Sequence, residues 1–385
     1  MSVIDQSAPG QATTPMQHAA VFVSLELSPK KWLVTSLSPG SEKLSKRWID
    51  GGDGAGLLAL LRELQAKAER RFGGQAKVVS IYEAGLDGFW LHRLLEANGI
   101  ESHVVDAGSI AAPRRKRRAK SDGIDGETLI RVLLAWLRHE PRVCSMVRPP
   151  SIAEEDRRRL SREREALVRE RTRESNRVRG LLMSQSVRDF KPLRGGARER
   201  LAELTTGDGR PLPPCLLAEL GRVLDRIALL VAQIAEVEAA SGRALAAAGG
   251  RDPAALLPQL RSLGQDTVAV LAFEGFWRRF ANRRQIAAYG GLAATPWRSG
   301  QLVHEQGIGG AGNPRLRKAM VQLAWLWLRH QPDSALSRWY RQRVGKEKGR
   351  ARRIAIVALA RKLLVALWRY VTQGTIPEGA VLKSV

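Results

Sequence analysis

Hydrophobic and polar residues alternate along the first part of the chain and later give way to helical spacings. Val21, Val23, Leu25 and Leu27 take every second position of "AAVFVSLELS", which predicts a strand over 19–28. Leucines three and four residues apart predict a helix over 56–72. The same patterns predict strands over 31–37, 43–49, 77–83 and 101–106 and helices over 87–99 and 125–139. This order indicates an α/β domain with a mixed sheet, whose first two strands form a hairpin.

The pattern changes at Ser151. Ser151 and Glu154 have the spacing of a capping box and predict a long, charged helix that runs to about Gln185. A stretch rich in glycine and proline predicts a loop over 191–214. Beyond it, apolar residues recur in a heptad seam: Leu216, Leu220, Val223, Ile227, Leu230, Ile234 and Val237. We expect an antiparallel helical hairpin, and the seam fits a bundle core within the chain and a coiled coil between subunits equally well.

The last part of the chain is predicted to be helical, with one glycine-rich interruption that we expect to be irregular. Asn313 is a natural N-cap and Pro314 a natural first helical residue, so a helix is expected from Arg315. A final helix is predicted over 352–371. The expected organisation is a disordered tail, an α/β domain, a helical hairpin or coiled coil, and a mostly helical C-terminal domain, over 1–18, 19–150, 151–250 and 251–385 respectively.

Charge narrows the classes of partner. The chain has 63 Lys and Arg against 38 Asp and Glu, a net charge of +25, which argues for nucleic acid or an acidic membrane surface. No uncharged run approaches the ~18 residues of a membrane span, and no secretory segment opens the chain. Cys144 and Cys215 cannot form a disulfide framework or a zinc cluster. A cytoplasmic location fits, and the chemistry must come from carboxylates or hydroxyls.

The densest cationic segment is followed at once by two acids. Six of the seven residues of "RRKRRAK" are basic: Arg114, Arg115, Lys116, Arg117, Arg118 and Lys120. Asp122 and Asp125 follow, three apart at the start of a helix, while Glu26 and Glu83 stand at the ends of predicted strands. Four carboxylates at one edge of a sheet suit a pair of Mg²⁺ or Mn²⁺ ions. Taken one at a time, each acid is more simply explained as a solvated surface group or a helix cap. The basic run is correspondingly either a grip on nucleic-acid phosphates or a solvated face.

These motifs, together with "FVSLELS", "YEAG", "KSDGIDGETL" and "GLAATPWRSGQLVHEQGIGGAGNPRLRK", resemble the insertion-sequence transposases of the DEDD type. The resemblance covers about residues 19 to 370. It implies a RuvC-like RNase H fold in the N-terminal domain, with Glu26, Glu83, Asp122 and Asp125 binding Mg²⁺. It also implies a C-terminal transposase domain in which Ser299 attacks DNA phosphate. A non-coding bridge RNA that pairs with target and donor DNA, and a homo-oligomer (dimer or tetramer), are the implied partners.

The sequence departs from the family pattern at two places. The first acid is usually aspartate, and Glu26 is longer by one methylene. Gly309 and Gly310 stand where the family usually carries a hydroxyl and a basic residue, and the loss of a cation there weakens a phosphate contact. Both departures leave open whether this member of the family is catalytically active.

Asn313, Arg315 and Arg317, around the start of the helix predicted from Arg315, are candidates for phosphate contact. The segment from Gly307 to Asn313 fits either a backbone N–H nest for phosphate, with Arg315 and Arg317 behind it, or a plain flexible loop. Without the resemblance, Ser299 would be read as a turn serine. The alternatives to a transposase are a RuvC-like junction nuclease that uses water, and a nucleic-acid-binding protein without catalysis.

Overall fold

The computed structural model describes residues 20–85, 88–110, 122–247, 249, 252–299, 302–308, 312–345 and 347–383, without the side chains of 122–125 and 294–306. The predicted tail and the basic segment Arg114 to Lys120 lie outside the described residues. The chain divides into two compact units, Met1–Pro150 and Ser151–Val385. The second unit contains both the predicted helical hairpin and the predicted C-terminal domain, and the separation of those two stays a prediction.

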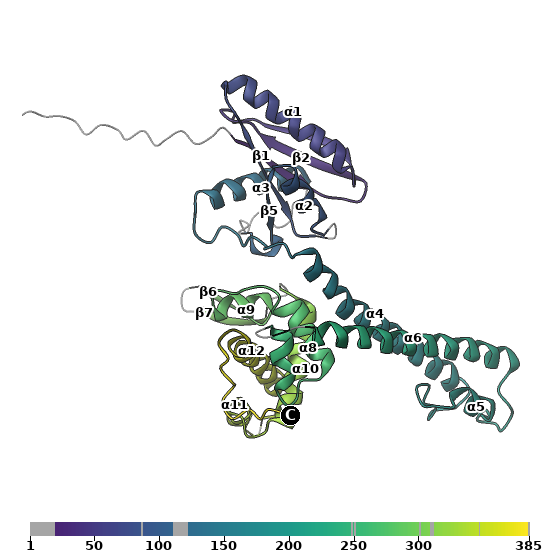
Figure 1. Ribbon diagram of the computed structural model, residues 1–385. Helices are drawn as coiled ribbons and strands as arrows, with labels where there is room; N and C mark the ends of the chain where they lie inside the picture. Colours follow the sequence, from purple (N-terminus) through teal and green to yellow (C-terminus); the bar gives the residue numbers. More distant parts are fainter. Residues whose placement is uncertain are drawn as a thin grey trace, which may run out of the picture. The chain divides into compact units, whose positions relative to one another are not determined.

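The first unit is built on a five-stranded mixed sheet with the order β3-β2-β1-β4-β5 (Figure 1). Its first three strands pair antiparallel, and β4 and β5 continue the sheet in parallel with β1. The strands are β1 Ala20–Glu26, β2 Lys31–Leu37, β3 Leu44–Asp50, β4 Lys77–Glu83 and β5 Glu101–Val105. The α/β domain and the first hairpin predicted from alternation are therefore confirmed.

Helices cover both faces of this sheet. The helices α1 Gly54–Phe72 and α2 Trp90–Ala97 pack on the face formed by residues such as Val21, Val23 and Leu25. On the other face, α3 Asp122–Leu137 packs against a core that includes Val79 and Ile81, and a short 3-10 turn, η1 Ala107–Ser109, follows β5. The helix α3 was predicted to begin at residue 125. That prediction was wrong by one turn, because the "DGID" segment is itself helical and α3 begins at Asp122. Asp122 and Asp125 both lie in the first part of α3.

The second unit opens with a pair of long helices, α4 Ile152–Met183 and α6 Pro214–Ala246, that pack along each other (Figure 1). The Ser151–Glu154 capping box is present with both of its hydrogen bonds. The heptad positions of α6 from Leu220 to Val237 are buried, so the seam serves a hairpin within the chain. The stretch predicted as a loop over 191–214 contains a short helix, α5 Ala197–Ala202.

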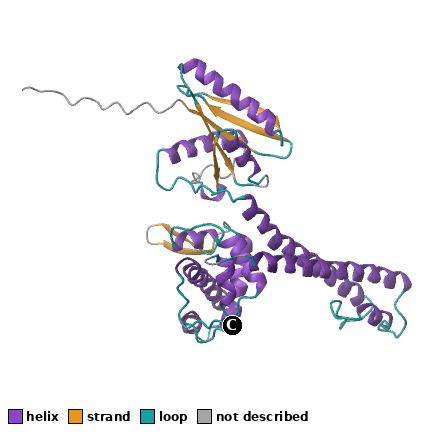
Figure 2. Cartoon of the chain, in the orientation of Figure 1, coloured by secondary structure: helices purple, strands orange, loops and turns teal. Residues whose placement is uncertain are grey.

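Among the residues described in the rest of the second unit, the regular elements are helical apart from one β-hairpin (Figure 2). The helical elements are α7 Pro253–Leu256, η3 Leu257–Gln259, α8 Gln265–Val270, the π-helical turn η4 Leu271–Gly275, α9 Arg283–Tyr289, α10 Pro314–His330, α11 Ala335–Val344 and α12 Arg350–Gln373. The hairpin pairs β6 Ala294–Ser299 with β7 Leu302–Ile308. The prediction that the glycine-rich segment is irregular was therefore wrong over those two strands, where Trp297 pairs with His304 and Arg298 with Val303.

The core of this part lies between α10 and α12. Met320, Leu323, Ala324 and Trp327 are fully buried, as their helical spacing predicts. Asn313 caps α10 through its side chain, which accepts from the N–H groups of Arg315 and Leu316, and Pro314 is the first helical residue. Among the described residues, no helix is long and apolar enough to cross a membrane.

Candidate functional site

The carboxyl ends of β1 and β4 lie side by side in the sheet. The two strands run parallel, with Leu25 paired to Tyr82, so the next position on each strand is Glu26 and Glu83. Ser24 and Ile81 face α3 and stand two positions before Glu26 and Glu83. Because side chains two apart on a strand share a face, both acids belong to the α3 face of the sheet. The structure thus brings together two of the four predicted acids at one edge of the sheet.

Close contact with the start of α3 defines this edge further. The Ser24 hydroxyl donates to the Gly126 carbonyl at 2.8 Å, and both groups are buried. A Cβ atom at Gly126 would lie 2.7 Å from Glu26 Oε1 and 2.5 Å from Thr35 Oγ1, so only glycine allows the helix to approach this closely. Asp125 directly precedes Gly126 in the chain, so this predicted acid adjoins the residue that approaches Glu26. The side chains of Asp122 and Asp125 lie outside the described residues.

The chemistry of the two described carboxylates suits a hard divalent cation, since Mg²⁺ and Mn²⁺ prefer oxygen ligands. Glu26 Oε1 is buried against α3, while the Glu83 side chain is exposed. Among the side chains that the structure describes, no three His, Cys, Asp or Glu residues lie close enough together to hold a metal ion. A ligand set of three or more at this edge would therefore need acids whose side chains are not described, as is the case for Asp122 and Asp125.

The predicted nucleophile belongs to the other unit. Ser299 is the last residue of β6 and pairs with Leu302 next to the turn of the hairpin; its side chain lies outside the description. The base of the hairpin is the pair Ala294 and Ile308. Gly307 has a φ of 79° and Gly312 a φ of 89°, while 309–311 between them are not described. The predicted phosphate nest over Gly307 to Asn313 thus stays a prediction.

Two of the predicted phosphate ligands have partners within the chain. The Arg315 guanidinium pairs with Glu165 of α4 at 2.9 Å, and Lys318 pairs with the same carboxylate at 3.1 Å. Burial opposes ionisation of Glu165, but the hydrogen bond from Lys318 and the charge of Arg315 outweigh it and hold the pKa of Glu165 below its ordinary value. Arg317, with its Nε buried, also has an internal partner. Their roles in binding nucleic acid stay predictions.

One further group, the buried carboxylate of Glu274, was not predicted from the sequence. It is 1% exposed, lies in the π-helical turn η4, and forms two hydrogen bonds with Arg162 of α4 at 2.6 and 3.3 Å. The hydrogen bond to Glu274 raises the pKa of Arg162, although partial burial opposes this. The one available signal was an acid inside the apolar run "VLAFEGFW".

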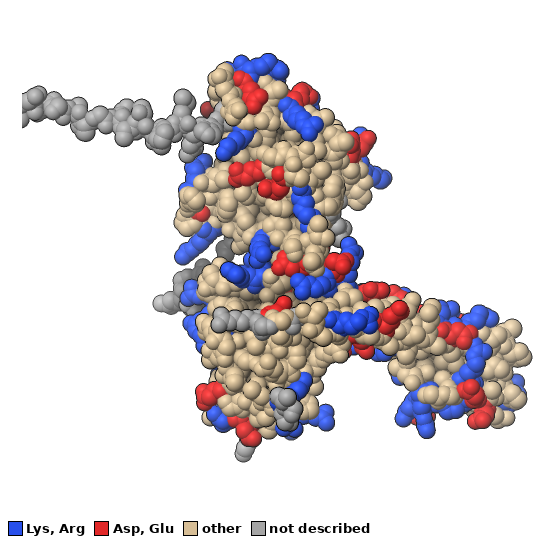
Figure 3. Space-filling view, viewed as in Figure 1, with Lys and Arg blue, Asp and Glu red and all other residues tan. Residues whose placement is uncertain are grey.

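The surface of the long hairpin of α4 and α6 is charged, but it is not a continuous cationic patch. Acids and bases alternate along it in Figure 3, and ion pairs such as Arg177 with Glu219 and Arg198 with Asp225 join its elements. A surface of interleaved signs is typical of a solvated helix face and does not present one continuous patch to a polyanion.

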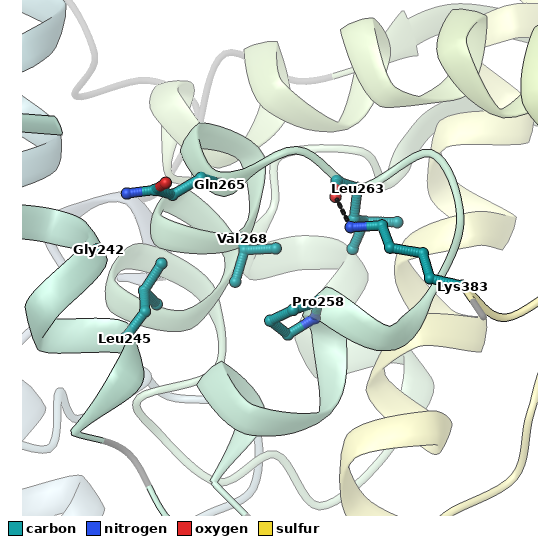
Figure 4. A pocket seen from close by; sticks show the side chains of 7 residues that line it. All are labelled: Gly242, Leu245, Pro258, Leu263, Gln265, Val268 and Lys383. Carbon is teal, nitrogen blue, oxygen red and sulfur yellow. Dashed lines mark hydrogen bonds between the residues drawn. The ribbon is translucent and has the colours of Figure 1, made fainter. Parts of the chain in front are cut away.

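A cavity of about 240 Å³ lies between α6, η3 and α8 (Figure 4). Its lining is mainly apolar, and the ammonium group of Lys383 donates to the Leu263 carbonyl at 3.0 Å. The volume is below the range of about 300–1,000 Å³ that is usual for small-molecule sites. This cavity is too small for an active site, and the described residues that line it include no carboxylate, histidine or cysteine beside Lys383.

Carboxylates gathered at the strand ends of an α/β sheet, in a chain with a net charge of +25, are typical of enzymes that act on nucleic acids. The family described as Transposase IS116/IS110/IS902 matches residues 254–339, and the DEDD transposase family of the IS110 group, described as Transposase, matches residues 34–185. These ranges include every predicted catalytic residue except Glu26.

Relatives match over most of the chain. A protein of Sinorhizobium fredii (strain NBRC 101917 / NGR234) with the name "Putative transposase y4rJ" is 57% identical over 376 residues, 95% of each chain. The transposase for insertion sequence element IS1328 of Yersinia enterocolitica is 26% identical over 67% of this chain and 73% of its own length. The chain belongs to the IS116/IS110/IS902 family of transposases. It is thus an enzyme that cuts and joins DNA, and its DEDD domain implies a divalent metal cofactor.

Proposed function

We propose that this transposase uses Glu26, Glu83, Asp122 and Asp125 as ligands of Mg²⁺ or Mn²⁺ and Ser299 as its nucleophile. The observation that carries the metal-site part is the close approach of Gly126 to Glu26, because it brings the start of α3 to the edge where β1 and β4 end. Parallel strand ends that meet a helix N-terminus are a common place for functional groups.

The first unit, in this proposal, is a RuvC-like RNase H fold. Three facts support it: the mixed sheet begins with three antiparallel strands, β4 and β5 extend it in parallel, and helices cover both faces. The match to the DEDD transposase family covers most of this unit.

The four acids have one task, which is to hold cations against a phosphodiester. Without cations, four carboxylates at one edge would repel each other and the DNA. Bound divalent ions supply charge neutralisation and polarise the phosphate oxygens. Glu26 is longer than the aspartate usual in the family, but it is the acid that directly contacts α3, so its carboxylate is held back against Gly126.

Ser299 is proposed to attack the DNA phosphorus. Its Oγ forms a new phosphorus–oxygen bond and loses its proton, while the bond from phosphorus to a deoxyribose oxygen breaks and that oxygen takes up a proton. The covalent link conserves the phosphodiester energy for rejoining. A position beside the turn of a β-hairpin favours access to a large substrate, since such turns lie at the surface.

Cationic residues are proposed to position the nucleic acid. Contacts to phosphate fix its register without reading its sequence, and the reading is left to a bridge RNA that pairs with the DNA. The proposed contacts are Arg114, Arg115, Lys116, Arg117, Arg118, Lys120, Asn313, Arg315 and Arg317. The active form is proposed to be a homo-oligomer, either a dimer or a tetramer.

The test compares the wild type with Ser299→Ala on labelled duplex DNA taken from the native flanks of the gene, with the RNA transcribed from those flanks. Denaturing electrophoresis separates covalent protein–DNA adducts from free strands. The wild type should form an adduct in Mg²⁺, and Ser299→Ala should bind DNA equally well and form none. An adduct with the variant would mean that another residue is the nucleophile. Cleavage without any adduct, in both proteins, would favour a nuclease that uses water.

A further inference from the structure

The hairpin that carries Ser299 is connected at its base to a polar cluster around the buried Glu274, whose other members are Arg162, Asn313 and Tyr289. The chain enters the hairpin a few residues after Tyr289 and leaves it a few residues before Asn313. These two residues contact each other, since the Asn313 N–H donates to the Tyr289 carbonyl at 2.6 Å. The two ends of the hairpin segment are therefore joined directly.

Gly312 makes this closure possible. A Cβ atom there would lie 2.6 Å from the Ala288 carbonyl oxygen, 2.6 Å from the Gly291 nitrogen and 2.7 Å from the Tyr289 carbonyl oxygen. These are backbone atoms that cannot move aside, and the φ of 89° also favours glycine. The chain that leaves the hairpin at Gly312 therefore packs directly against the end of α9, from which the chain enters the hairpin.

Glu274 connects this closure to the long helix α4. Its Oε2 accepts from the Asn313 amide at 3.0 Å, and its backbone carbonyl accepts from the Tyr289 hydroxyl at 2.9 Å. The same carboxylate accepts two hydrogen bonds from Arg162. A carboxylate that is 1% exposed is retained at a large desolvation cost, which these charged and polar partners offset. The π-helical turn presents it there, and such turns are frequent at functional sites.

Neighbouring groups hold the turn itself in place. Arg158 of α4 donates to the Phe273 carbonyl at 3.3 Å, and its guanidinium lies 3.7 Å from the centre of the Trp277 ring. The Trp277 indole N–H donates to the Tyr289 hydroxyl at 3.2 Å. Burial lowers the pKa of Arg158, in part countered by the charges around it. The turn η4 is therefore fixed from α4 on one side and from α9 on the other.

We propose that Glu274 is a positioning residue for the nucleophile: through Asn313 and Arg162 it fixes the hairpin base to α4, so that Ser299 keeps one place. This inference rests on the proposed role of Ser299. A displacement of about 1 Å in a reacting group is enough to lower a rate about a hundredfold, so a rigid base has a direct effect on chemistry.

The test uses two single variants and their combination in the full-length chain. Asn313→Asp keeps the oxygen that caps α10, because aspartate is an equally good N-cap, but it turns the donor towards Glu274 into an acceptor. Glu274→Gln removes the charge with little change of shape. In the double variant, the amide introduced at position 274 can donate to the carboxylate introduced at position 313, so the hydrogen bond returns with its direction reversed. Glu174→Gln is the matched control, since Glu174 is also a buried carboxylate with arginine partners, in its case Arg173 and Arg226.

The first measurement is peptide-resolved hydrogen exchange. In each single variant the amides of residues 294–308 should exchange about tenfold faster or more, while those of α12 keep their rates. The double variant should recover protection of the hairpin, and Glu174→Gln should leave it unchanged. The second measurement is the rate of adduct formation at saturating concentrations of the flanking DNA, so that a change of affinity at Asn313 does not enter. This rate should fall about a hundredfold in the single variants and recover in the double variant.

Unchanged hairpin exchange in both single variants would overturn the inference, as would faster exchange spread over the whole unit or no recovery in the double variant. The exchange result does not depend on which residue attacks DNA. If Ser299→Ala still forms the adduct, the proposed nucleophile is wrong, while the mechanical link from Glu274 to the hairpin is still decided by exchange.

Discussion

Replacing Gly126 with alanine tests the geometry on which the proposed metal site depends. The new methyl group would lie 2.5 Å from Thr35 Oγ1 and 2.7 Å from Glu26 Oε1, well inside van der Waals contact. Thr35 is fully buried and β-branched, so it has little freedom to retreat. The Glu26 carboxylate is at the end of a flexible side chain and can move, but it would then leave its position beside the end of β4.

The two contacts predict two separate effects. Glycine to alanine within a helix ordinarily stabilises a protein by about 0.8–1.0 kcal/mol. Overpacking of a filled site costs about 1–3 kcal/mol. The clash with Thr35 therefore outweighs the gain in helix propensity, and the net loss in unfolding free energy is about 0–2 kcal/mol. The displacement of Glu26 should in addition reduce Mg²⁺-dependent strand cleavage.

Gly180→Ala in α4 is the control. Gly180 is also helical, but a Cβ atom there would have no neighbour within 4 Å. This variant should gain the full propensity term, so the two changes should differ by about 1–3 kcal/mol. Native-state hydrogen exchange of α3 and α4 peptides is the suitable assay, because the two units need not unfold together.

Equal stabilisation by both substitutions, with normal cleavage by Gly126→Ala, would refute the packing of α3 against Glu26 and Thr35. The metal-site proposal would then lose its structural support. Loss of cleavage in Gly126→Ala with an unchanged α3 exchange rate would instead show that Glu26 alone had moved.

Other predictions concern the acids, the basic segment and one ion-paired carboxylate. Asp122→Ala or Asp125→Ala should abolish strand cleavage in Mg²⁺ and leave DNA binding intact, because these acids act only through a metal; wild-type cleavage by both would rule out their assignment. Neutralising Arg114, Arg115, Arg117 and Arg118 together should weaken binding to all sequences and reduce the log–log salt slope by about 0.9 for each lost phosphate contact, and an unchanged slope would mark a solvated face. The pKa of Glu165 is lowered in the folded chain, so its ion pairs stabilise the fold above the ordinary value of 4.5 and lose this contribution as the pH falls below it. Exchange of α4 and α10 amides should show this pH dependence in the wild type and not in Glu165→Gln.

The regular elements follow largely from local pattern. Period-two alternation predicted β1 and its neighbours, helical spacing predicted the buried face of α10, and Asn313–Pro314 predicted the residue at which that helix begins. These features depend on residues only a few positions apart, so a sequence contains them directly. The same patterns placed Glu26 and Glu83 at the ends of strands and Asp122 and Asp125 near the start of a helix, as in the structure, while their role as metal ligands stays a prediction.

Other features depend on residues that are distant along the chain. Ser24 and Gly126 are 102 positions apart, and no local pattern shows that the start of α3 reaches the end of β1. The strand pairing across a glycine-rich segment, and the start of α3 one turn before its apolar pattern, likewise depend on tertiary contacts that compete with local preference.

The buried carboxylate of Glu274 is the clearest case. In the sequence it is one acid in an apolar run, and by residue type alone it would be placed at the surface. Its partners Arg162 and Asn313 are 112 and 39 positions away, and only the packing of α4 against η4 and the start of α10 brings them together. Local pattern was enough to predict most helices and strands, though not α5 or the β6–β7 hairpin, and to place the acids of the N-terminal domain along them. The tertiary structure decided which polar groups meet in the interior, because burial of a charge is favourable only where a fold supplies its partners.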